Sequence, residues 1–304
     1  MKAGVDLIVQ QMLSESALSP ELTDTLLRNA TSPSYWAALA KTAALPPEVG
    51  LDDAELERAA LHFREEGYFA TRPVIAPGAA EALRSIVERV VAAGWPAVFA
   101  FACEPVWAVS QSSSLVRLLT RALGEGYRHR EQIYCHWVSP VKGAAGWSPH
   151  VDGPGSQRRL SVWVPLSDAT LENGCMMVIP KSRLGAELQG VAFHERTSFG
   201  FAETHKLLHA ARALPAKAGS LLGWDFDVVH WGSMCDGGGH PRVSLAIEFE
   251  SAAAPAGESP RFDPLVVPPL EQRMTAIARA VLGYARFVPM LNRYRDLATR
   301  LLDG

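Results

Sequence analysis

The most constraining feature of this 304-residue chain is a series of short apolar segments between residues 130 and 250. Each is rich in Val, Ile, Leu and aromatic residues, and turn residues separate them: QIYCHWVSP, RLSVWVPLSD, CMMVIP, GSLLGWDF and PRVSLAIEFE. Such segments are typical of β-strands. Because no regular helix follows each strand, an antiparallel sandwich or barrel is favoured over a doubly wound parallel sheet.

Helical patterns flank this series on both sides. Apolar residues three and four apart recur before residue 50, and Ser19 followed by Pro20 is a good helix start. After residue 250 a loop leads into a helical tail that is broken at Pro289. The fold class we expect is mainly β with flanking helices (α+β). We expect a helical N-terminal extension at 1–50, a β domain with its own helices at 51–250, and a helical tail at 251–304 that packs on the same domain.

Composition narrows the class of protein. The chain is 48% hydrophobic and 20% charged, with a net charge of -3, which argues against a nucleic-acid partner. No signal peptide is evident, and the longest apolar stretch, near residues 90–109, is interrupted by two prolines and a glutamate, so no membrane partner is expected. The four scattered cysteines form no CxxC pair. Reduced, buried thiols in a cytoplasmic protein are the simpler interpretation.

A candidate metal site begins in the stretch GWSPHVDGPG, which places His150 two residues before Asp152. This pair alone is a weak signal, because Asp before Gly is common in turns. Residues i and i+2 of a strand point the same way, so both side chains can approach one ion. His230, at the end of the segment GWDFDVVH, is a candidate third ligand. Two histidines with one carboxylate leave three positions open on an octahedral iron.

The last predicted strand carries an arginine on its inner face. Arg242, Ser244 and Ala246 share one face, and the intervening residues of the other face are apolar and can pack on helices. Arg242 would then point into the interior. A buried guanidinium is costly unless it meets an anion, and a carboxylate ligand would be a suitable partner.

These residues stand in an order that resembles the phytanoyl-CoA dioxygenase family of iron(II)- and 2-oxoglutarate-dependent oxygenases. The resemblance runs from about FREEGYF (63–69) to AIEFE (246–250). It rests on the His-x-Asp pair, on the block VWVPLSDATLENGCMMVIP, on the distal histidine and on the PRVS block.

The resemblance implies a double-stranded β-helix, a barrel of the jelly-roll or cupin-like type. It implies His150, Asp152 and His230 as ligands of Fe(II), with Arg242 gripping the distal carboxylate of the co-substrate 2-oxoglutarate. Trp163 matches a family tryptophan near that cofactor, although ordinary core packing explains it equally well. Ser233 and Ser244 are candidate hydroxyl partners of the cofactor.

The activity implied is oxidation by O2, most often hydroxylation, of a C–H bond in a small-molecule substrate, with succinate and CO2 as co-products. Halogenating relatives replace the carboxylate ligand with a small residue, so Asp152 favours hydroxylation. The sequence departs from the family pattern where Lys181 follows Pro180 and where Trp231 follows the distal histidine. These departures remove no ligand, but they prevent any transfer of substrate preference.

Two other classes stay open: a non-catalytic binding protein on the same fold, and a cupin-like oxygenase that does not use 2-oxoglutarate. The insert at 185–215, with His194, His205 and His209, is expected to be a lid or surface segment rather than a second metal site. Glu172 to Gly174 are expected to form a turn. The tail at 270–302 would serve either as a cap on the barrel or as the contact of a homodimer.

Overall fold

Two antiparallel sheets form the centre of the molecule. The fold is that of a computed structural model, which describes residues 17–41, 48–153, 158–185, 199–237, 239–255 and 260–303. In the larger sheet the strand order is β1 (Tyr68–Pro73), β6 (Ser220–Asp225), β3 (Arg159–Pro165), β8 (Arg242–Glu250), β2 (Arg128–Val138) and β9 (Arg261–Phe262). The smaller sheet has the order β5 (Arg212–Leu214), β4 (Met176–Val178) and β7 (His230–Gly232). All described pairings are antiparallel, as the sequence predicted.

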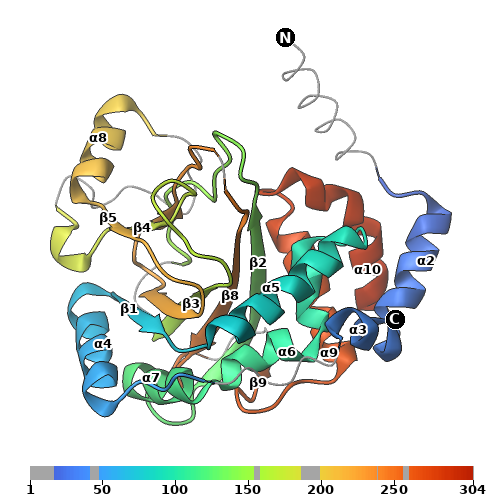
Figure 1. The fold of residues 1–304 in the computed structure, drawn as a ribbon, viewed down its shortest axis with the longest axis horizontal. Coiled ribbons are helices and arrows are strands. Elements are labelled where there is room, and N and C mark those ends of the chain that lie inside the picture. The colour runs from blue at the N-terminus through green and yellow to red at the C-terminus, as the bar shows by residue number, and fades with distance from the viewer. Residues whose placement is uncertain are drawn as a thin grey trace.

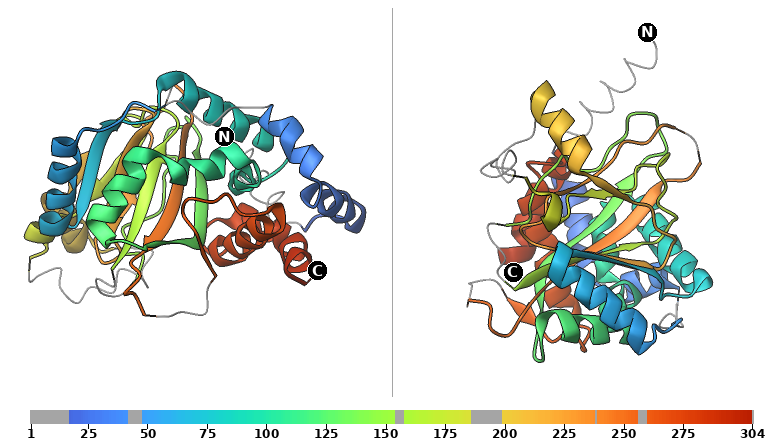
Figure 2. Two further views of the ribbon diagram at one scale, coloured as in Figure 1. Left: turned by 90° about the horizontal axis from the view of Figure 1, so that it is seen from below. Right: turned by 90° about the vertical axis from the view of Figure 1, so that its left-hand side faces the viewer.

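Helices cover one face of the larger sheet and extend beyond its β2 edge (Figures 1 and 2). The α-helices are α2 (Pro20–Ala30), α3 (Pro33–Ala40), α4 (Asp53–Glu66), α5 (Pro77–Ala92), α6 (Glu104–Trp107), α7 (Ser113–Leu123), α8 (Phe201–Ala210), α9 (Leu270–Tyr284) and α10 (Arg295–Asp303). Short 3-10 helices are η1 (Ala97–Ala102), η2 (Ala108–Gln111), η3 (Lys181–Arg183) and η4 (Pro289–Tyr294). Among the described residues, no helix is long and apolar enough to cross a membrane.

Local signals explain where several helices begin and end. Ser19 caps α2 as predicted, because its Oγ accepts a hydrogen bond from the backbone N–H of Leu22 at 3.2 Å. Asp52 and Glu55 form a reciprocal capping box at the start of α4. The predicted break at Pro289 is the start of η4, between α9 and α10. The apolar helical pattern expected before residue 17 lies outside the described residues.

Strand β8 separates two environments. Its residues Val243, Leu245, Ile247 and Phe249 are fully buried in the main core, which they share with the covering helices. The alternate residues of β8 face the space between the two sheets, as the alternation in the sequence predicted. A second buried cluster lies between the sheets and includes Trp163, Leu222 and Trp224.

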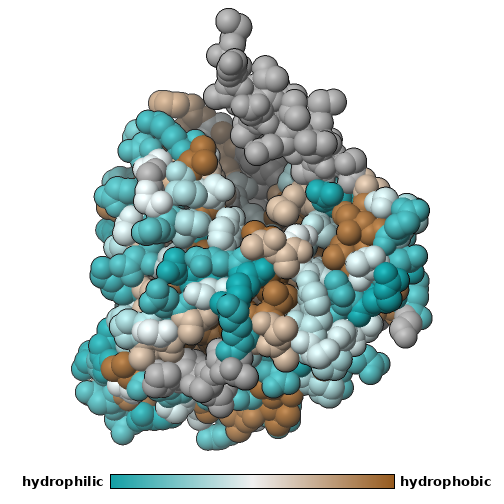
Figure 3. Space-filling model, turned by 45° about the vertical axis from the view of Figure 1, so that its right-hand side comes forward, coloured by the Kyte–Doolittle hydropathy of each residue, from teal (hydrophilic) through white to brown (hydrophobic). Residues whose placement is uncertain are grey.

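The two ends of the described chain pack together, with α2, α3, α9 and α10 gathered on one side in Figure 1. Arg300 of α10 forms a 2.8 Å ion pair with Asp24 of α2. The hydroxyl of Tyr294 donates to the carbonyl of Gly94, at the end of α5, at 2.7 Å. On the face shown in Figure 3, apolar residues form separate groups among polar ones. The homodimer expected through these helices stays a prediction.

A glycine before β6 gives the first testable prediction. Gly219 has φ +81°, and a Cβ at this position would lie 2.4 Å from the carbonyl oxygen of Ile75. We expect Gly219→Ala to lower the free energy of unfolding by at least about 1 kcal/mol, because both the backbone conformation and the contact oppose a side chain. Chemical denaturation measures this change.

Gly283 near the end of α9 is the matched control, because a Cβ there would meet no atom within 4 Å. Gly283→Ala should raise the free energy of unfolding by about 0.5–1 kcal/mol through helix propensity. Equal effects of the two substitutions would contradict the close approach at Gly219.

Candidate metal centre and pocket

Three of the predicted site residues come together between the sheets. His150 and His230 exchange backbone hydrogen bonds of 3.1 and 2.9 Å, which hold the loop before β3 against β7. The Oδ1 atom of Asp152 lies 3.7 Å from Nε2 of His150 and 3.6 Å from Nε2 of His230. Two bonds of about 2.1 Å to one ion allow ligand atoms up to about 4.2 Å apart, so these separations suit a shared metal. Within the described ranges, this is the one group of three or more such side chains that could hold an ion.

Hydrogen bonds behind the triad fix the direction of each side chain. Nδ1 of His150 contacts the carbonyl of Ser148 at 2.7 Å, and Nδ1 of His230 contacts the carbonyl of Val228 at 3.0 Å. A backbone carbonyl at Nδ1 selects the tautomer with a proton there, which leaves Nε2 with its lone pair directed at the centre.

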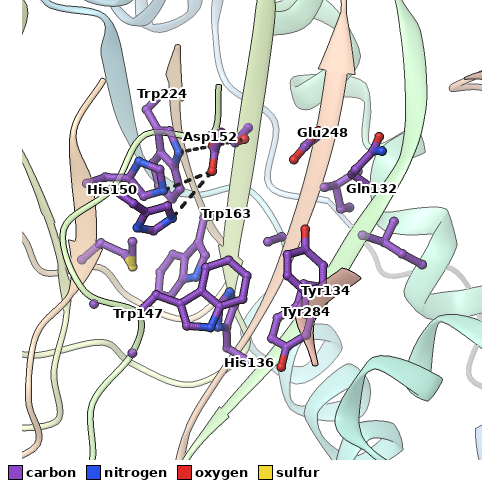
Figure 4. Close-up of a pocket in the computed structure, with 18 of the residues that line it drawn as sticks. Gln132, Tyr134, His136, Trp147, His150, Asp152, Trp163, Trp224, Glu248 and Tyr284 are labelled. Atoms are coloured by element: carbon purple, nitrogen blue, oxygen red, sulfur yellow. Dashed lines mark hydrogen bonds and ion pairs between the residues drawn. The ribbon is translucent and has the colours of Figure 1, made fainter. Parts of the chain in front are cut away.

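The carboxylate of Asp152 is oriented in the same way. Its Oδ2 accepts hydrogen bonds from Oγ of Ser161 at 2.6 Å and from Nε1 of Trp224 at 3.0 Å. Figure 4 shows these contacts and the approach of the remaining oxygen to the two imidazoles. Oδ1 is therefore the oxygen that faces both imidazoles.

The protonation states also suit a metal site. Burial lowers the pKa of His230 to about 4, so its ring is neutral near pH 7. Burial alone would raise the pKa of Asp152, but His230, His150 and the hydrogen bonds from Ser161 and Trp224 hold it below its usual value. Neutral imidazoles and an ionised carboxylate are the forms that bind a divalent cation.

Arg242 lines the same pocket. Its guanidinium is a buried cation, because the residue is only 2% exposed. Its Nη1 contacts the Met176 sulfur at 3.7 Å and its guanidinium lies 5.8 Å from the Trp163 ring, while its Nε has no hydrogen bond in the described structure. No carboxylate within the described ranges pairs with it. Burial lowers the pKa of Arg242 to about 10, and it remains charged at neutral pH.

Two glycines make room for this guanidinium. A Cβ on Gly146 would lie 2.9 Å from its Nη2, and a Cβ on Gly232 would lie 2.8 Å from the same atom. Larger residues would occupy the space around the donors. An unpaired cation held in a cradle of glycines is an arrangement suited to a small anionic ligand.

The other predicted cofactor residues are placed as follows. Ser244 lies opposite His136 on β2 and Pro165 on β3, and its buried hydroxyl has no hydrogen-bond partner in the described structure. Trp163 lines the pocket opposite Ala246. Ser233 does not line the pocket, and its backbone N–H donates to the carbonyl of Cys175 at 3.0 Å.

An aromatic wall completes the pocket, and sequence reasoning missed it. Trp147 packs against Tyr134 of β2 at a ring-centroid distance of 5.2 Å and against Tyr284 of α9 at 4.9 Å. It also contacts His136 at 5.1 Å and the ligand candidate His150 at 5.6 Å. The helical tail therefore contributes Tyr284 to the pocket, and the choice between its two expected roles, cap or dimer contact, stays open.

The sequence signals that could have placed these residues near the site differ in strength. Trp147 stands three residues before His150, and Tyr134 and His136 alternate on one predicted strand. Period-two alternation could have placed Tyr134 and His136 on one face, and only its closeness in sequence to His150 could have pointed to Trp147. Tyr284 carries no such signal, because only the folding of α9 against β2 brings it there.

A carboxylate stands at the end of the pocket opposite Arg242. Glu248 continues the inward face of β8, six residues after Arg242. Burial raises the pKa of Glu248 to about 8, and the charge of Asp152 adds to this effect against the opposing effect of Arg130. Figure 4 shows Glu248 and Gln132 across the pocket from His150 and Trp224.

One departure from the family pattern, Lys181, has a structural role. Lys181 forms ion pairs with Asp225 at 2.8 Å and Asp227 at 3.2 Å, which join η3 to the end of β6.

The turn expected at 172–174 is present: Oδ1 of Asn173 accepts from the backbone N–H of Thr170 at 2.7 Å, and Gly174 has φ +87°. His205 and His209 lie on α8, whereas His194 and residues 186–198 lie outside the described part.

Comparison with known proteins agrees with this geometry. Residues 106–236 match the family model described as phytanoyl-CoA dioxygenase (PhyH). The predicted resemblance to the phytanoyl-CoA dioxygenase family is thereby confirmed for this region, which includes the triad and ends before Arg242. No curated protein matches the chain.

Solved structures share the fold at low sequence identity. The α-ketoglutarate-dependent epimerase SnoN, described in complex with Fe3+, α-ketoglutarate and nogalamycin RO, is 18% identical, with TM-score 0.55 over 71% of this chain and 89% of its own. The α-ketoglutarate-dependent carbocyclase SnoK from nogalamycin biosynthesis is 16% identical, with TM-score 0.52 over 72% and 99%. EctD from S. alaskensis, with 2-oxoglutarate and 5-hydroxyectoine, is 18% identical, with TM-score 0.54 over 70% and 85%.

The unpaired state of Arg242 leads to a stability prediction. Arg242→Met should raise the free energy of unfolding of the ligand-free protein by about 1 kcal/mol or more, because it replaces a buried, unpaired cation with an apolar side chain. Chemical denaturation of the metal-free protein measures it.

Arg273→Met is the control, because Arg273 is also buried but donates hydrogen bonds to the carbonyls of Ala102 and Pro268. Its loss should lower the free energy of unfolding by about 1–3 kcal/mol. Strong destabilisation by Arg242→Met would mean that the Arg242 guanidinium is structural.

Proposed function

We propose that this chain is an iron(II)- and 2-oxoglutarate-dependent oxygenase that hydroxylates a C–H bond of a small-molecule substrate. One observation carries the proposal: a His-Asp-His triad and a buried, unpaired arginine line the same pocket. The expected double-stranded β-helix is part of the proposal. So is the division into a helical extension, an oxygenase domain and a C-terminal tail on that domain.

The residues present fit both cofactors. His150, Asp152 and His230 would hold Fe(II), since Nε2 of His150 is buried without a hydrogen bond in the described structure and Oδ1 of Asp152 is turned toward both rings. Arg242 would bind the distal carboxylate of 2-oxoglutarate, which would pair its free Nε and satisfy a charge that is otherwise buried alone. Ser244 has a free hydroxyl on the same face of β8 and would add a hydrogen bond.

Iron(II) with bound 2-oxoglutarate and O2 would supply the oxidising chemistry, with succinate and CO2 as co-products. The protein's own contribution is positioning and the exclusion of water. Ser161 and Trp224 hold the Asp152 carboxylate, and the rings of Trp163 and Trp147 line the pocket beside the triad. The position of the substrate in the pocket would decide which C–H bond is oxidised.

The similar structures support the cofactors and leave the reaction open. SnoN and EctD are described with iron or its co-substrate, whereas the reactions named are an epimerisation for SnoN and a carbocyclisation for SnoK. Hydroxylation rests instead on Asp152, whose carboxylate occupies the position that halogenating relatives leave open.

The main test is an anaerobic titration of the metal-free protein with iron(II) and 2-oxoglutarate. We expect the weak visible charge-transfer band of a chelated 2-oxo acid. The band should be absent in His150→Ala and should need several-fold more 2-oxoglutarate in Arg242→Ala. His205→Ala, on α8 and outside the pocket lining, is the matched control and should behave as the unchanged protein.

Other outcomes would select the alternatives. Iron binding without any effect of 2-oxoglutarate or of Arg242→Ala would indicate a cupin-like oxygenase of another type. A protein that binds no iron would be a binding protein on this fold.

The second test concerns the groups behind the ligands. Ser161→Ala removes one of the two hydrogen bonds on Oδ2 of Asp152, so we expect iron(II) affinity to fall about 10- to 100-fold with the fold intact. Competition with a fluorescent chelator measures this affinity. Ser182→Ala removes an exposed hydroxyl that bonds Glu66, and it should leave the affinity unchanged.

A further inference from the structure

The pocket has a cation at one end and a carboxyl group at the other. On the inward face of β8, Arg242 stands at one end and Glu248 at the other, with Ser244 and Ala246 between them. Six residues of strand separate the two residues by about 20 Å along the backbone. The proposed function uses the cationic end and leaves the carboxyl end without a role.

A second acceptor lies beside Glu248. Gln132 shares the inward face of β2 with Tyr134 and His136, and all three line the pocket. The buried Oε1 of Gln132 has no hydrogen-bond partner in the described structure. The pairing of β2 with β8 is irregular at this point, because three residues of β2 between His129 and Ile133 lie opposite Glu248 alone.

Glu248 is held in place but is only partly neutralised. Nε of Arg130 donates to its Oε2 at 3.1 Å, while Nη1 of the same guanidinium donates to Glu250 at 2.7 Å. Within the described ranges, no hydrogen bond reaches the second oxygen of Glu248. One carboxylate oxygen and one amide oxygen therefore remain as acceptors on the same wall.

The aromatic wall lies beside these acceptors. Tyr134, Trp147 and Tyr284 all line the pocket, and neighbouring rings of this group have centroids 4.7–5.2 Å apart. Aromatic faces attract cations, most strongly where water is excluded. Carboxylate, amide oxygen and ring faces together favour a group that is positively charged and donates several hydrogen bonds.

We propose that the substrate is a small amine, bound with its protonated nitrogen at Glu248 and Gln132 and its hydrocarbon part against Tyr134, Trp147 and Tyr284. An ammonium group has up to three N–H donors and no acceptor, which matches the free carboxylate oxygen of Glu248 and the free amide oxygen of Gln132. Ser161, which holds Asp152, pairs directly with Glu248 across β3 and β8, so an amine bound there lies next to the metal triad. The oxidation of this amine rests on the proposed function. Its binding does not, and it is measured separately.

The test uses three probes with one ring and different head groups: cyclohexylmethylamine, cyclohexylmethanol and cyclohexanecarboxylate. Calorimetric titrations are made anaerobically at pH 8.5, above the pKa of about 8 to which burial raises Glu248, on protein loaded with iron(II) and 2-oxoglutarate, and again without them. The amine should bind about tenfold or more tightly than the alcohol, and the acid most weakly. An amine that does not bind, or binds no tighter than the alcohol, overturns the proposal.

Two variants locate the preference in the pocket. Glu248→Gln should reduce the preference for amine over alcohol to within about twofold, and Gln132→Leu should weaken amine binding about three- to tenfold. Gln132→Leu keeps the carboxylate and its contact with Arg130, so it tests the site even where Glu248→Gln disturbs folding. Glu271→Gln, exposed in the first turn of α9, is the matched control and should retain the full preference.

The same samples separate this proposal from the proposed function. A preference for the amine that persists in Gln132→Leu and in folded Glu248→Gln overturns the amine site. An amine preference that both variants reduce, in protein without the charge-transfer band, supports the amine site and refutes the oxygenase. A normal band with no amine preference refutes the amine site alone.

Discussion

The structure depends on the two-faced burial of β8 between β2 and β3. Its odd-numbered residues from Val243 to Phe249 are anchored in the helix-covered core, which fixes the register of the strand. A shift by one residue would exchange the two faces and bury the charges in that core. Burial of one face of β8 therefore keeps Arg242 and Glu248 on the opposite face, which lines the pocket. The backbone hydrogen bonds of the strand alone would not fix this register.

Around this strand the site is assembled from segments that are distant in sequence. The backbone pair between His150 and His230 joins the loop before β3 to β7, and Ser161 and Trp224 supply the hydrogen bonds that aim Asp152. The result is a pocket with unsatisfied groups: an unpaired cation at one end and free acceptors at the other. Such groups oppose stability when the pocket is empty, and they match the charges that we assign to the co-substrate and the substrate.

Strand alternation in the sequence predicted much of this arrangement. It placed Arg242 inward and its neighbours outward, and both directions agree with the structure. The same rule extended to Glu248 and to Tyr134 would have predicted more of the pocket. It would also have placed Gln132 in the pocket with Tyr134, but it would not have predicted the irregular pairing opposite Glu248, which no residue in this stretch marks. No local sequence pattern could have predicted that Tyr284 lines the pocket, because α9 reaches it only through the packing of the tail against β2.

The sequence by itself determined the antiparallel strands, the helices around them, the identity of the ligand candidates and their resemblance to the phytanoyl-CoA dioxygenase family. These depend on residue type and on spacings of a few residues, which the chain carries locally. Only the tertiary structure decided which oxygen of Asp152 faces the histidines, which charges remain unpaired, and which aromatic rings enclose the pocket. Those properties arise mainly from contacts between residues far apart in the sequence, such as Asp152 with Trp224 and Trp147 with Tyr284. The physical cause is the packing of the helices and the small sheet around β8.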